Sequence, residues 1–180
     1  LIKNKKVLKT GNTITDIVKS NLPLLKKNNI IKKLNVKQRN YFLATLHRPE
    51  SVDNHINFKK IILTFNRISN LYKKKIIFPL HPRTEKIFNK LKTKINKNII
   101  ITKPLEYIDF LYLMKNCRII FTDSGGIQEE SSILGVPCIT TRTTTERQIS
   151  IKSKINILTG YDQKKILKAV KKFYNIKLKK

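Results

Sequence analysis

The sequence predicts a parallel α/β sheet with flanking helices, a Rossmann-like arrangement. Short and almost wholly apolar runs alternate with longer segments of helical period. This alternation is typical of parallel strands whose two faces are both covered by helices. Polar and titratable residues follow the apolar runs directly, and ligands of such sheets bind at the carboxyl ends of the strands.

Five apolar runs are the expected strands: Tyr41–Leu46, Ile76–Leu80, Ile99–Thr102, Ile119–Thr122 and Val136–Thr140. The helices expected between and after them are Ile56–Tyr72, Glu85–Leu91, Tyr107–Lys115, Ile127–Leu134 and Lys164–Tyr174. Each helix follows a strand, so the pattern favours crossover connections and one continuous sheet over residues 36–180.

The start of the chain has a different pattern. Val7–Thr10 is a candidate strand, Gly11–Asn12 a turn and Thr13–Ser20 a helix, whereas Asn21–Lys37 is polar and lysine-rich like a linker. We therefore expect residues 1–35 to be the end of a preceding lobe and an interdomain linker. Because the chain begins with Leu1 and not with methionine, it is expected to be part of a longer protein.

The composition fits one lobe of ordinary size. The chain has 180 residues and 40% hydrophobic content, without the run of about 18 apolar residues that a membrane span needs. Its N-terminus also lacks the apolar stretch of a signal peptide, so we expect a cytoplasmic protein that does not enter a membrane. Cys117 and Cys138 lie in apolar stretches and outside any Cys/His cluster, which favours free buried thiols and no metal site.

The net charge of +28 raises the possibility of nucleic-acid binding. Lysine supplies most of this charge and is spread over the whole chain, together with abundant isoleucine and asparagine. AT-rich codons encode all three residues, so genome composition accounts for them jointly. Clustered arginines with interleaved aromatics, the usual pattern of RNA-binding surfaces, are lacking. We expect non-specific attraction to polyanions at low salt and no specific nucleic-acid partner.

The most informative segment runs from Thr122 to Glu130, where an apolar strand leads into a helix through Ser124, Gly125 and Gly126. Such a turn exposes backbone N–H groups at a helix N-terminus, which favours a bound phosphate. Glu130 lies about one and a half turns into the helix, where its carboxylate could accept from two ribose hydroxyls. The alternative is an ordinary capped turn with acidic residues in the first turns.

Two other expected strands are each followed directly by a histidine. His47, Arg48 and Glu50 follow the first strand, and this combination suits proton transfer and anion binding. His81 follows the second strand between two prolines that stiffen its position. The alternatives are a polar loop for the first group and a structural histidine for the second.

Two weaker segments complete the candidates. Arg142 and Arg147 flank a threonine-rich stretch that suits a phosphate or sugar loop, or else a solvent-facing turn. Phe110, or the backbone near Leu105, could flank a flat base, although Phe110 taken alone is better explained as a core aromatic of an amphipathic helix.

In their order along the chain, these motifs resemble those of the non-hydrolysing UDP-N-acetylglucosamine 2-epimerases. The resemblance covers nearly the whole chain and includes the opening Thr10-Gly11-Asn12-Thr13 with Asp16. Its most specific parts are Asp123–Glu130 and Thr144–Arg147. Departures occur at loop positions, where Pro49, Ser51, Thr143 and Gln148 replace residues that are more common in the family.

The resemblance implies the C-terminal half of a glycosyltransferase-B-like fold, with two Rossmann-like lobes, a UDP-sugar in the cleft and usually a homodimer. The implied reaction inverts C2 of UDP-N-acetylglucosamine to give UDP-N-acetylmannosamine, through elimination and re-addition of UDP, without metal or redox cofactor. It assigns catalysis to His47, with Arg48 and Glu50 beside it. It assigns substrate binding to His81, Phe110, Ser124, Gly125, Gly126, Glu130, Arg142 and Arg147.

The resemblance also implies that an N-terminal lobe with further catalytic carboxylates is missing. We therefore expect the chain alone to be inactive. The alternatives are a non-catalytic UDP-sugar-binding fragment, a polyanion-binding protein and a related glycosyltransferase of the same architecture. The run Thr144–Arg147 argues against the last of these.

Overall fold

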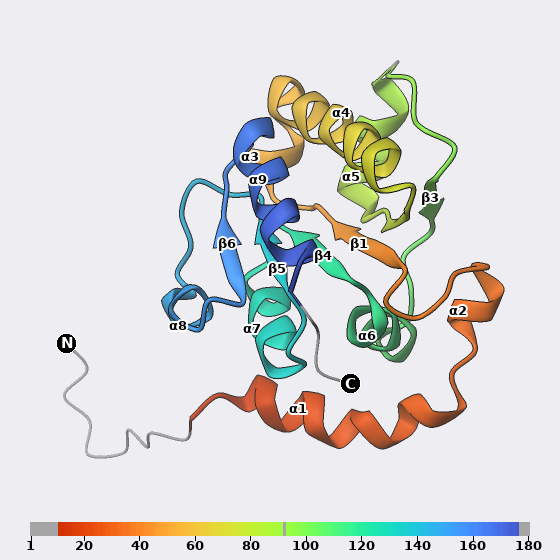
Figure 1. The fold of residues 1–180 in the computed structure, drawn as a ribbon, viewed down its shortest axis with the longest axis vertical. Helices are drawn as coiled ribbons and strands as arrows, with labels where there is room; N and C mark the ends of the chain where they lie inside the picture. Colours follow the sequence, from red (N-terminus) through yellow and green to blue (C-terminus); the bar gives the residue numbers. More distant parts are fainter. Residues whose placement is uncertain (1–10, 92, 177–180) are drawn as a thin grey trace.

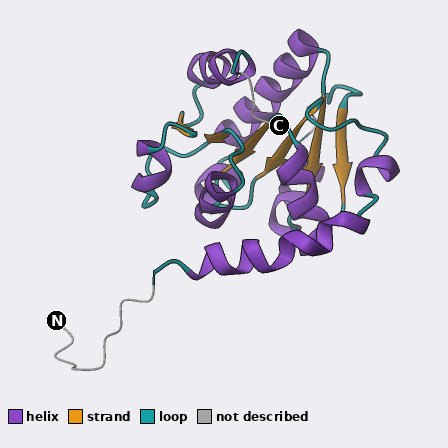
Figure 2. Ribbon diagram, turned by 60° about the horizontal axis from the view of Figure 1, so that its bottom comes forward, coloured by secondary structure: helices purple, strands orange, loops and turns teal. Residues whose placement is uncertain are grey.

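The computed structural model describes residues 11–91 and 93–176 and contains one six-stranded sheet (Figures 1 and 2). All neighbouring strands pair in parallel, in the order β3-β2-β1-β4-β5-β6. This is the strand order of the Rossmann fold. The strands are β1 (Tyr41–Thr45), β2 (Lys75–Pro79), β3 (Ile99–Thr102), β4 (Ile119–Thr122), β5 (Cys138–Thr140) and β6 (Asn156–Leu158).

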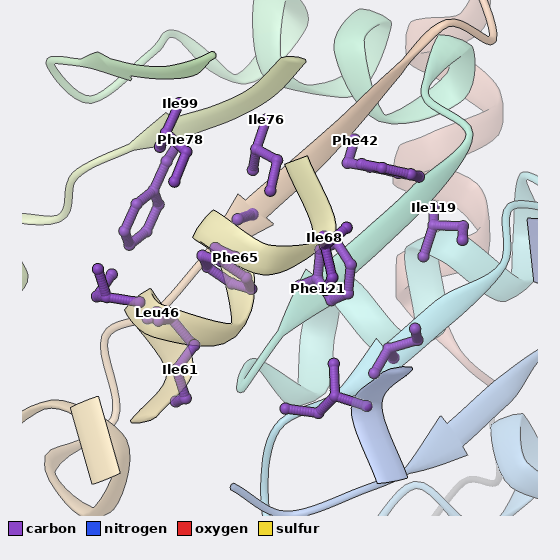
Figure 3. Close-up of a cluster of buried hydrophobic side chains, with 14 of the residues drawn as sticks. Phe42, Leu46, Ile61, Phe65, Ile68, Ile76, Phe78, Ile99, Ile119 and Phe121 are labelled. Carbon is purple, nitrogen blue, oxygen red and sulfur yellow. The ribbon is translucent and has the colours of Figure 1, made fainter. Parts of the chain in front are cut away.

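Successive residues of the central strands point to opposite faces of the sheet. Phe42, Phe78 and Phe121 face one side, where Phe65 and Ile68 of α4 (His55–Tyr72) pack over them (Figure 3). This face is also covered by α9 (Gln163–Tyr174), with partly buried side chains of α5 (Pro82–Lys90) at its edge. The three phenylalanines are fully buried under these helices, as expected for strands of a sheet that helices cover.

The opposite face has its own cluster, in which Leu43, Ile77 and Ile120 pack against α6 (Tyr107–Asn116). Partly buried side chains of α7 (Gly125–Ile133) join this cluster, and α1 (Thr13–Asn21) packs along α7 (Figure 1). The molecule therefore has three layers, with the sheet in the middle.

All five expected strands and all five helices expected after Tyr41 are confirmed; Ile99–Thr102 and Ile119–Thr122 have the expected bounds, and the other elements have shifted ends. The expected helix at Thr13–Ser20 is confirmed as α1. The structure adds β6, α3 (Pro49–Val52) and α8 (Gln148–Lys152), which the sequence did not predict. With three to five residues each, these elements are too short to show a period. The candidate strand Val7–Thr10 lies outside the described residues.

The stretch 21–37 is more ordered than its linker-like composition predicted. It contains the 3₁₀ helix η1 (Leu22–Lys27) and the short helix α2 (Ile30–Lys33). Leu25, Ile30 and Ile31 are buried in the cluster under α6, and the Asn28 amide donates to Asp109 of α6 at 2.6 Å. This segment therefore packs as part of one face of the sheet, while a domain boundary near residue 35 stays a prediction.

Candidate functional site

The site lies where the connections of the sheet change direction. From β1 the chain moves outward to β2 and β3, and from β4 it moves the opposite way to β5 and β6. β1 and β4 are neighbours, so the loops that leave their carboxyl ends diverge, and α/β sheets bind their ligands at such a switch point. His47 follows β1 and Asp123 follows β4, which brings residues 76 positions apart into contact.

Asp123 joins the two loops and is fully buried. Its carboxylate accepts the backbone N–H of His47 at 3.0 Å and of Arg48 at 2.9 Å, and lies 3.4 Å from Nδ1 of the His47 ring. A buried carboxylate needs such donors, and here they fix the loop that carries the candidate catalytic histidine. The sequence analysis did not include Asp123 among the site residues. Its position directly after a buried strand was the available signal.

His47 is half-buried beside Asp123. Burial lowers the pKa of its imidazole below 6.5, against the opposing effect of the Asp123 carboxylate. The ring of His81 lies 5.6 Å from that of His47, centre to centre. His81 also caps α5, since its Nδ1 accepts the backbone N–H of Arg83 at 3.2 Å. His81 thus has a structural role as the cap of α5, and its role in substrate binding stays a prediction.

The N-terminus of α7 opens at the same edge of the sheet. Ser124 is the N-cap residue with extended backbone, and its own N–H donates to Thr122 Oγ1 at 3.0 Å. The helical hydrogen bonds begin with the N–H of Gln128 bonding to Ser124 O. The amides of the preceding turn, from Gly125 onward, therefore point out of the helix end, where they and the helix dipole favour an anion.

Residues 142–147, the arginine loop, lie across this helix end. Arg142 pairs with Glu146 at 3.2 Å, and Arg147 pairs with Glu129 of α7 at 3.1 Å. A Cβ atom added to Gly125 would lie 2.5 Å from Glu146 Oε1 and 3.3 Å from Arg147 Nε. The loop thus lies close against the start of α7 and brings the Arg147 guanidinium there, together with the Glu146 carboxylate and its partner Arg142.

Glu130 is linked to a residue that the sequence analysis passed over. The hydroxyl of Tyr107, at the start of α6, donates to Glu130 Oε1 at 3.2 Å. Burial raises the pKa of the Glu130 carboxyl, and the hydrogen bond from Tyr107 acts in the opposite direction. Burial and the nearby carboxylate raise the pKa of Tyr107 to about 12, so its hydroxyl stays a donor at neutral pH. Tyr107 and Glu130 together form a polar pair that joins α6 to α7.

Two of the candidates contribute less to this geometry. Phe110 is half-buried on α6 and packs against the apolar cluster beneath that helix, which agrees with its reading as a core aromatic. Glu50 is exposed in α3. Arg48 Nε, by contrast, is buried and has no hydrogen-bond partner among the described residues. The roles of Phe110 and Glu50 in substrate binding stay predictions.

The site thus consists of two halves that Asp123 connects. His47, Arg48 and His81 lie at the ends of β1 and β2, whereas Ser124–Gly126 and the arginine loop lie at the ends of β4 and β5. Within residues 11–91 and 93–176, no group of three or more His, Cys, Asp or Glu side chains is placed to hold a metal ion. In the same part of the chain, no helix has both the length and the apolar character needed to cross a bilayer.

This fold and this site define a Rossmann-like α/β lobe with an uncapped helix N-terminus at the point where the sheet changes direction. The chain belongs to the UDP-N-acetylglucosamine 2-epimerase family, whose model matches residues 2–180.

Its relatives include a UDP-N-acetylglucosamine 2-epimerase of Methanocaldococcus jannaschii, 44% identical over 98% of this chain and 50% of that protein. The structure of the M. jannaschii enzyme with UDP-GlcNAc and UDP superimposes with a TM-score of 0.87 over 99% of this chain and 51% of the other. The enzyme of Neisseria meningitidis bound to UDP-GlcNAc has 33% identity and a TM-score of 0.78, over 93% of this chain and 47% of the other. The chain therefore spans about half the length of the curated relatives it matches.

Proposed function

We propose that this chain binds the UDP part of UDP-N-acetylglucosamine and supplies one side of the active site of a 2-epimerase. Ser124, Gly125 and Gly126 hold the diphosphate at the N-terminus of α7. Arg142 and Arg147 neutralise its charge, and Glu130 accepts hydrogen bonds from the ribose hydroxyls. The uracil lies near Phe110, and Arg48, Glu50 and His81 contact the sugar side.

One observation carries this proposal. The helix end and the arginine loop meet at the same place, as shown by the 2.5 Å and 3.3 Å that separate a Gly125 Cβ from Glu146 and Arg147. Backbone amides and the Arg147 guanidinium meet there, a combination that suits a diphosphate, which would take the place of the Glu146 carboxylate beside Gly125. The matching structures of M. jannaschii and N. meningitidis, which contain UDP-GlcNAc, support the choice of a nucleotide sugar.

The chemistry proposed for this site is inversion at C2. A base removes the C2 proton while the C1–O bond breaks, so that UDP leaves and a C1–C2 double bond forms in 2-acetamidoglucal. A proton is then delivered to the other face of C2, and UDP adds back to C1. His47 transfers protons in this scheme, because its lowered pKa leaves the imidazole neutral at pH 7 and able to accept one. Asp123 beside Nδ1 then stabilises the imidazolium.

The arginine loop and the start of α7 serve the leaving group. Negative charge develops on UDP as the C1–O bond breaks, and fixed amides and guanidinium groups stabilise charge that grows in the transition state. The groups on the other side of the sugar must come from a second lobe, since acid–base work at C2 needs both faces. The homodimer of the full-length family and a cytoplasmic location stay predictions.

Calorimetric titration with UDP tests the binding proposal. We expect UDP to bind more tightly than ADP, and Glu130→Gln to weaken UDP binding by about 1.5–3 kcal/mol, because it removes a charged acceptor. Glu85→Gln, an exposed change in the first turn of α5, is the matched control and should leave UDP affinity unchanged.

The main alternative is non-specific attraction of a very basic chain to polyanions. It predicts equal affinities for UDP and ADP, loss of binding with rising salt, and no effect of Glu130→Gln. That combination of results would refute the proposed UDP site.

A further inference from the structure

Behind the arginine loop lies a buried network of polar side chains centred on Gln128. Gln128 Oε1 accepts a hydrogen bond from Thr145 Oγ1 at 2.8 Å and another from Asn156 Nδ2 at 3.1 Å. Asn156 belongs to β6 and also accepts from Thr140 Oγ1 of β5 at 2.8 Å. Gln128, Thr140, Thr145 and Asn156 are all at most 7% exposed. One glutamine of α7 thus connects two strands and a loop.

The network determines the path of the arginine loop. Thr145 Oγ1 accepts the backbone N–H of Arg147 at 3.1 Å, so the hydroxyl that holds Gln128 also holds the backbone of the binding arginine. Ser150 Oγ donates to Arg147 O at 2.7 Å and accepts from Asn156 Nδ2 at 3.0 Å. The backbone of Arg147 is therefore tied to Gln128 at both its N–H and its carbonyl, through Thr145 on one side and Ser150 and Asn156 on the other.

Apolar packing would not give this precision, because it has no direction and lets a loop shift. Buried hydrogen bonds are directional, and each one left unpaired in the interior is costly, so a nearly satisfied network favours a single arrangement. Of the amide atoms of Gln128, only Nε2 has no hydrogen-bond partner among the described residues, whereas Oε1 accepts two hydrogen bonds. Gln128 therefore holds the loop through its side-chain oxygen and not through its amide nitrogen.

We propose that Gln128 is a positioning residue, which holds Arg147 over the start of α7 through Thr145 and Asn156 without touching the substrate itself. The expected effect on UDP affinity rests on the proposed function, because the diphosphate is the ligand that a misplaced Arg147 would bind less well. The arrangement of the loop can be measured without any ligand.

The test combines UDP titration with amide hydrogen exchange. Thr145→Val removes the hydroxyl that bonds both Gln128 and Arg147, and Gln128→Met removes the acceptor at similar size. Each should lower UDP affinity about tenfold and speed exchange of the Arg147 amide by a similar factor. Thr145→Ser keeps the hydroxyl and should restore both values to near those of the unsubstituted chain.

The control is Thr64→Val in α4, another buried threonine that loses a side-chain hydrogen bond, here to Lys60 O. It should lower the melting temperature without changing UDP affinity or exchange at Arg147. UDP affinity within twofold of native in folded Thr145→Val and Gln128→Met overturns the inference. Should Gln128→Met fail to fold, the smaller change at Thr145 decides alone.

A failure of the proposed function gives a different result. In that case the unsubstituted chain does not bind UDP, while the exchange data still decide whether Gln128 positions the loop. Unchanged exchange of the Arg147 amide in Thr145→Val would then overturn the positioning role.

Discussion

At the residue scale, the environment of His47 contains two opposing effects. Burial disfavours the charged imidazolium, and the carboxylate of Asp123, 3.4 Å from Nδ1, favours it. The first effect is larger, so the pKa lies below its ordinary value. An imidazole that is neutral at pH 7 can accept a proton, and the neighbouring carboxylate stabilises the imidazolium that forms. Both properties suit a group that accepts and then releases a proton.

This balance predicts a titration that NMR can follow at the His47 ring. Its pKa should lie below 6.5 in the unsubstituted chain and fall further in Asp123→Asn, because the effect that raises it is lost. Asp53→Asn, which alters an exposed carboxylate paired with Arg83, should leave it unchanged. A His47 pKa above 6.5, or one that rises in Asp123→Asn, would contradict this description.

The sign of the linked effect on stability is also fixed. A histidine with a lowered pKa binds fewer protons in the folded state than in the unfolded state, so its contribution is present above pH 6.5 and is lost as the pH falls below that value.

At the scale of elements, the start of α7 depends on two adjacent glycines with different surroundings. A methyl group on Gly125 would collide with Glu146 and crowd Arg147, whereas one on Gly126 has only Ser124 Oγ near it, at 3.9 Å. A side chain at the first glycine would therefore displace the half-exposed end of the Glu146 side chain. The second is free to approach a ligand, and the fold itself does not need it.

Replacing each glycine by alanine compares these two surroundings. Gly125→Ala should lower the free energy of unfolding by up to about 1 kcal/mol, because the Glu146 carboxylate must swing out and give up its pairing with Arg142. Gly126→Ala should keep or slightly raise it, by up to about 1 kcal/mol, because alanine favours helix. Denaturant titrations measure both values, and equal losses in the two variants would refute the close packing of loop against helix.

The same elements show how far the sequence alone could predict this structure. The strands and long helices were predictable because their apolar periods extend over many residues, and the site lay at the strand ends as expected. The role of Asp123 required knowing that β1 and β4 are neighbours. The contact of Tyr107 with Glu130 joins residues 23 positions apart, and its hydrogen bond depends on how α6 and α7 pack. No local pattern contains that information.

The order of residues 21–37, which their composition did not predict, has an equally physical cause. The stretch 21–37 is rich in lysine and asparagine, but Leu25, Ile30 and Ile31 still suffice to bury it against α6. In a chain with 39 Lys and Arg residues, polar composition is a poor guide to which segments lack structure. The long aliphatic stems of lysine can cover apolar surface while the charge stays in water.

At the scale of the whole molecule, the proposed function makes the chain one wall of a two-lobed cleft. It spans about half the length of its curated relatives, and the sugar of a bound nucleotide would be open to water on its other side. Polar contacts weaken in the high dielectric of water, and proton transfer to one face of C2 has no counterpart on the other.

We therefore expect binding without turnover. In heavy water, this chain alone should not exchange the C2 proton of UDP-N-acetylglucosamine for deuterium, as measured by NMR of the sugar. In a second experiment, a separately produced first lobe of a relative, such as the M. jannaschii enzyme, is added. Deuterium exchange in the mixture would show that this chain can supply its side of an active site. Exchange by the chain alone would show that the second wall is dispensable.

The most direct test of the central claim is to map UDP on the chain by amide chemical shifts. The largest changes should occur at Gly125 and Gly126 and in the arginine loop, with smaller ones near His47 and Glu130. Changes concentrated on the exposed lysines of α9, with Gly125 and Gly126 unaffected, would show that the chain attracts UDP only as a polyanion and would contradict the site proposed at the switch point of the sheet.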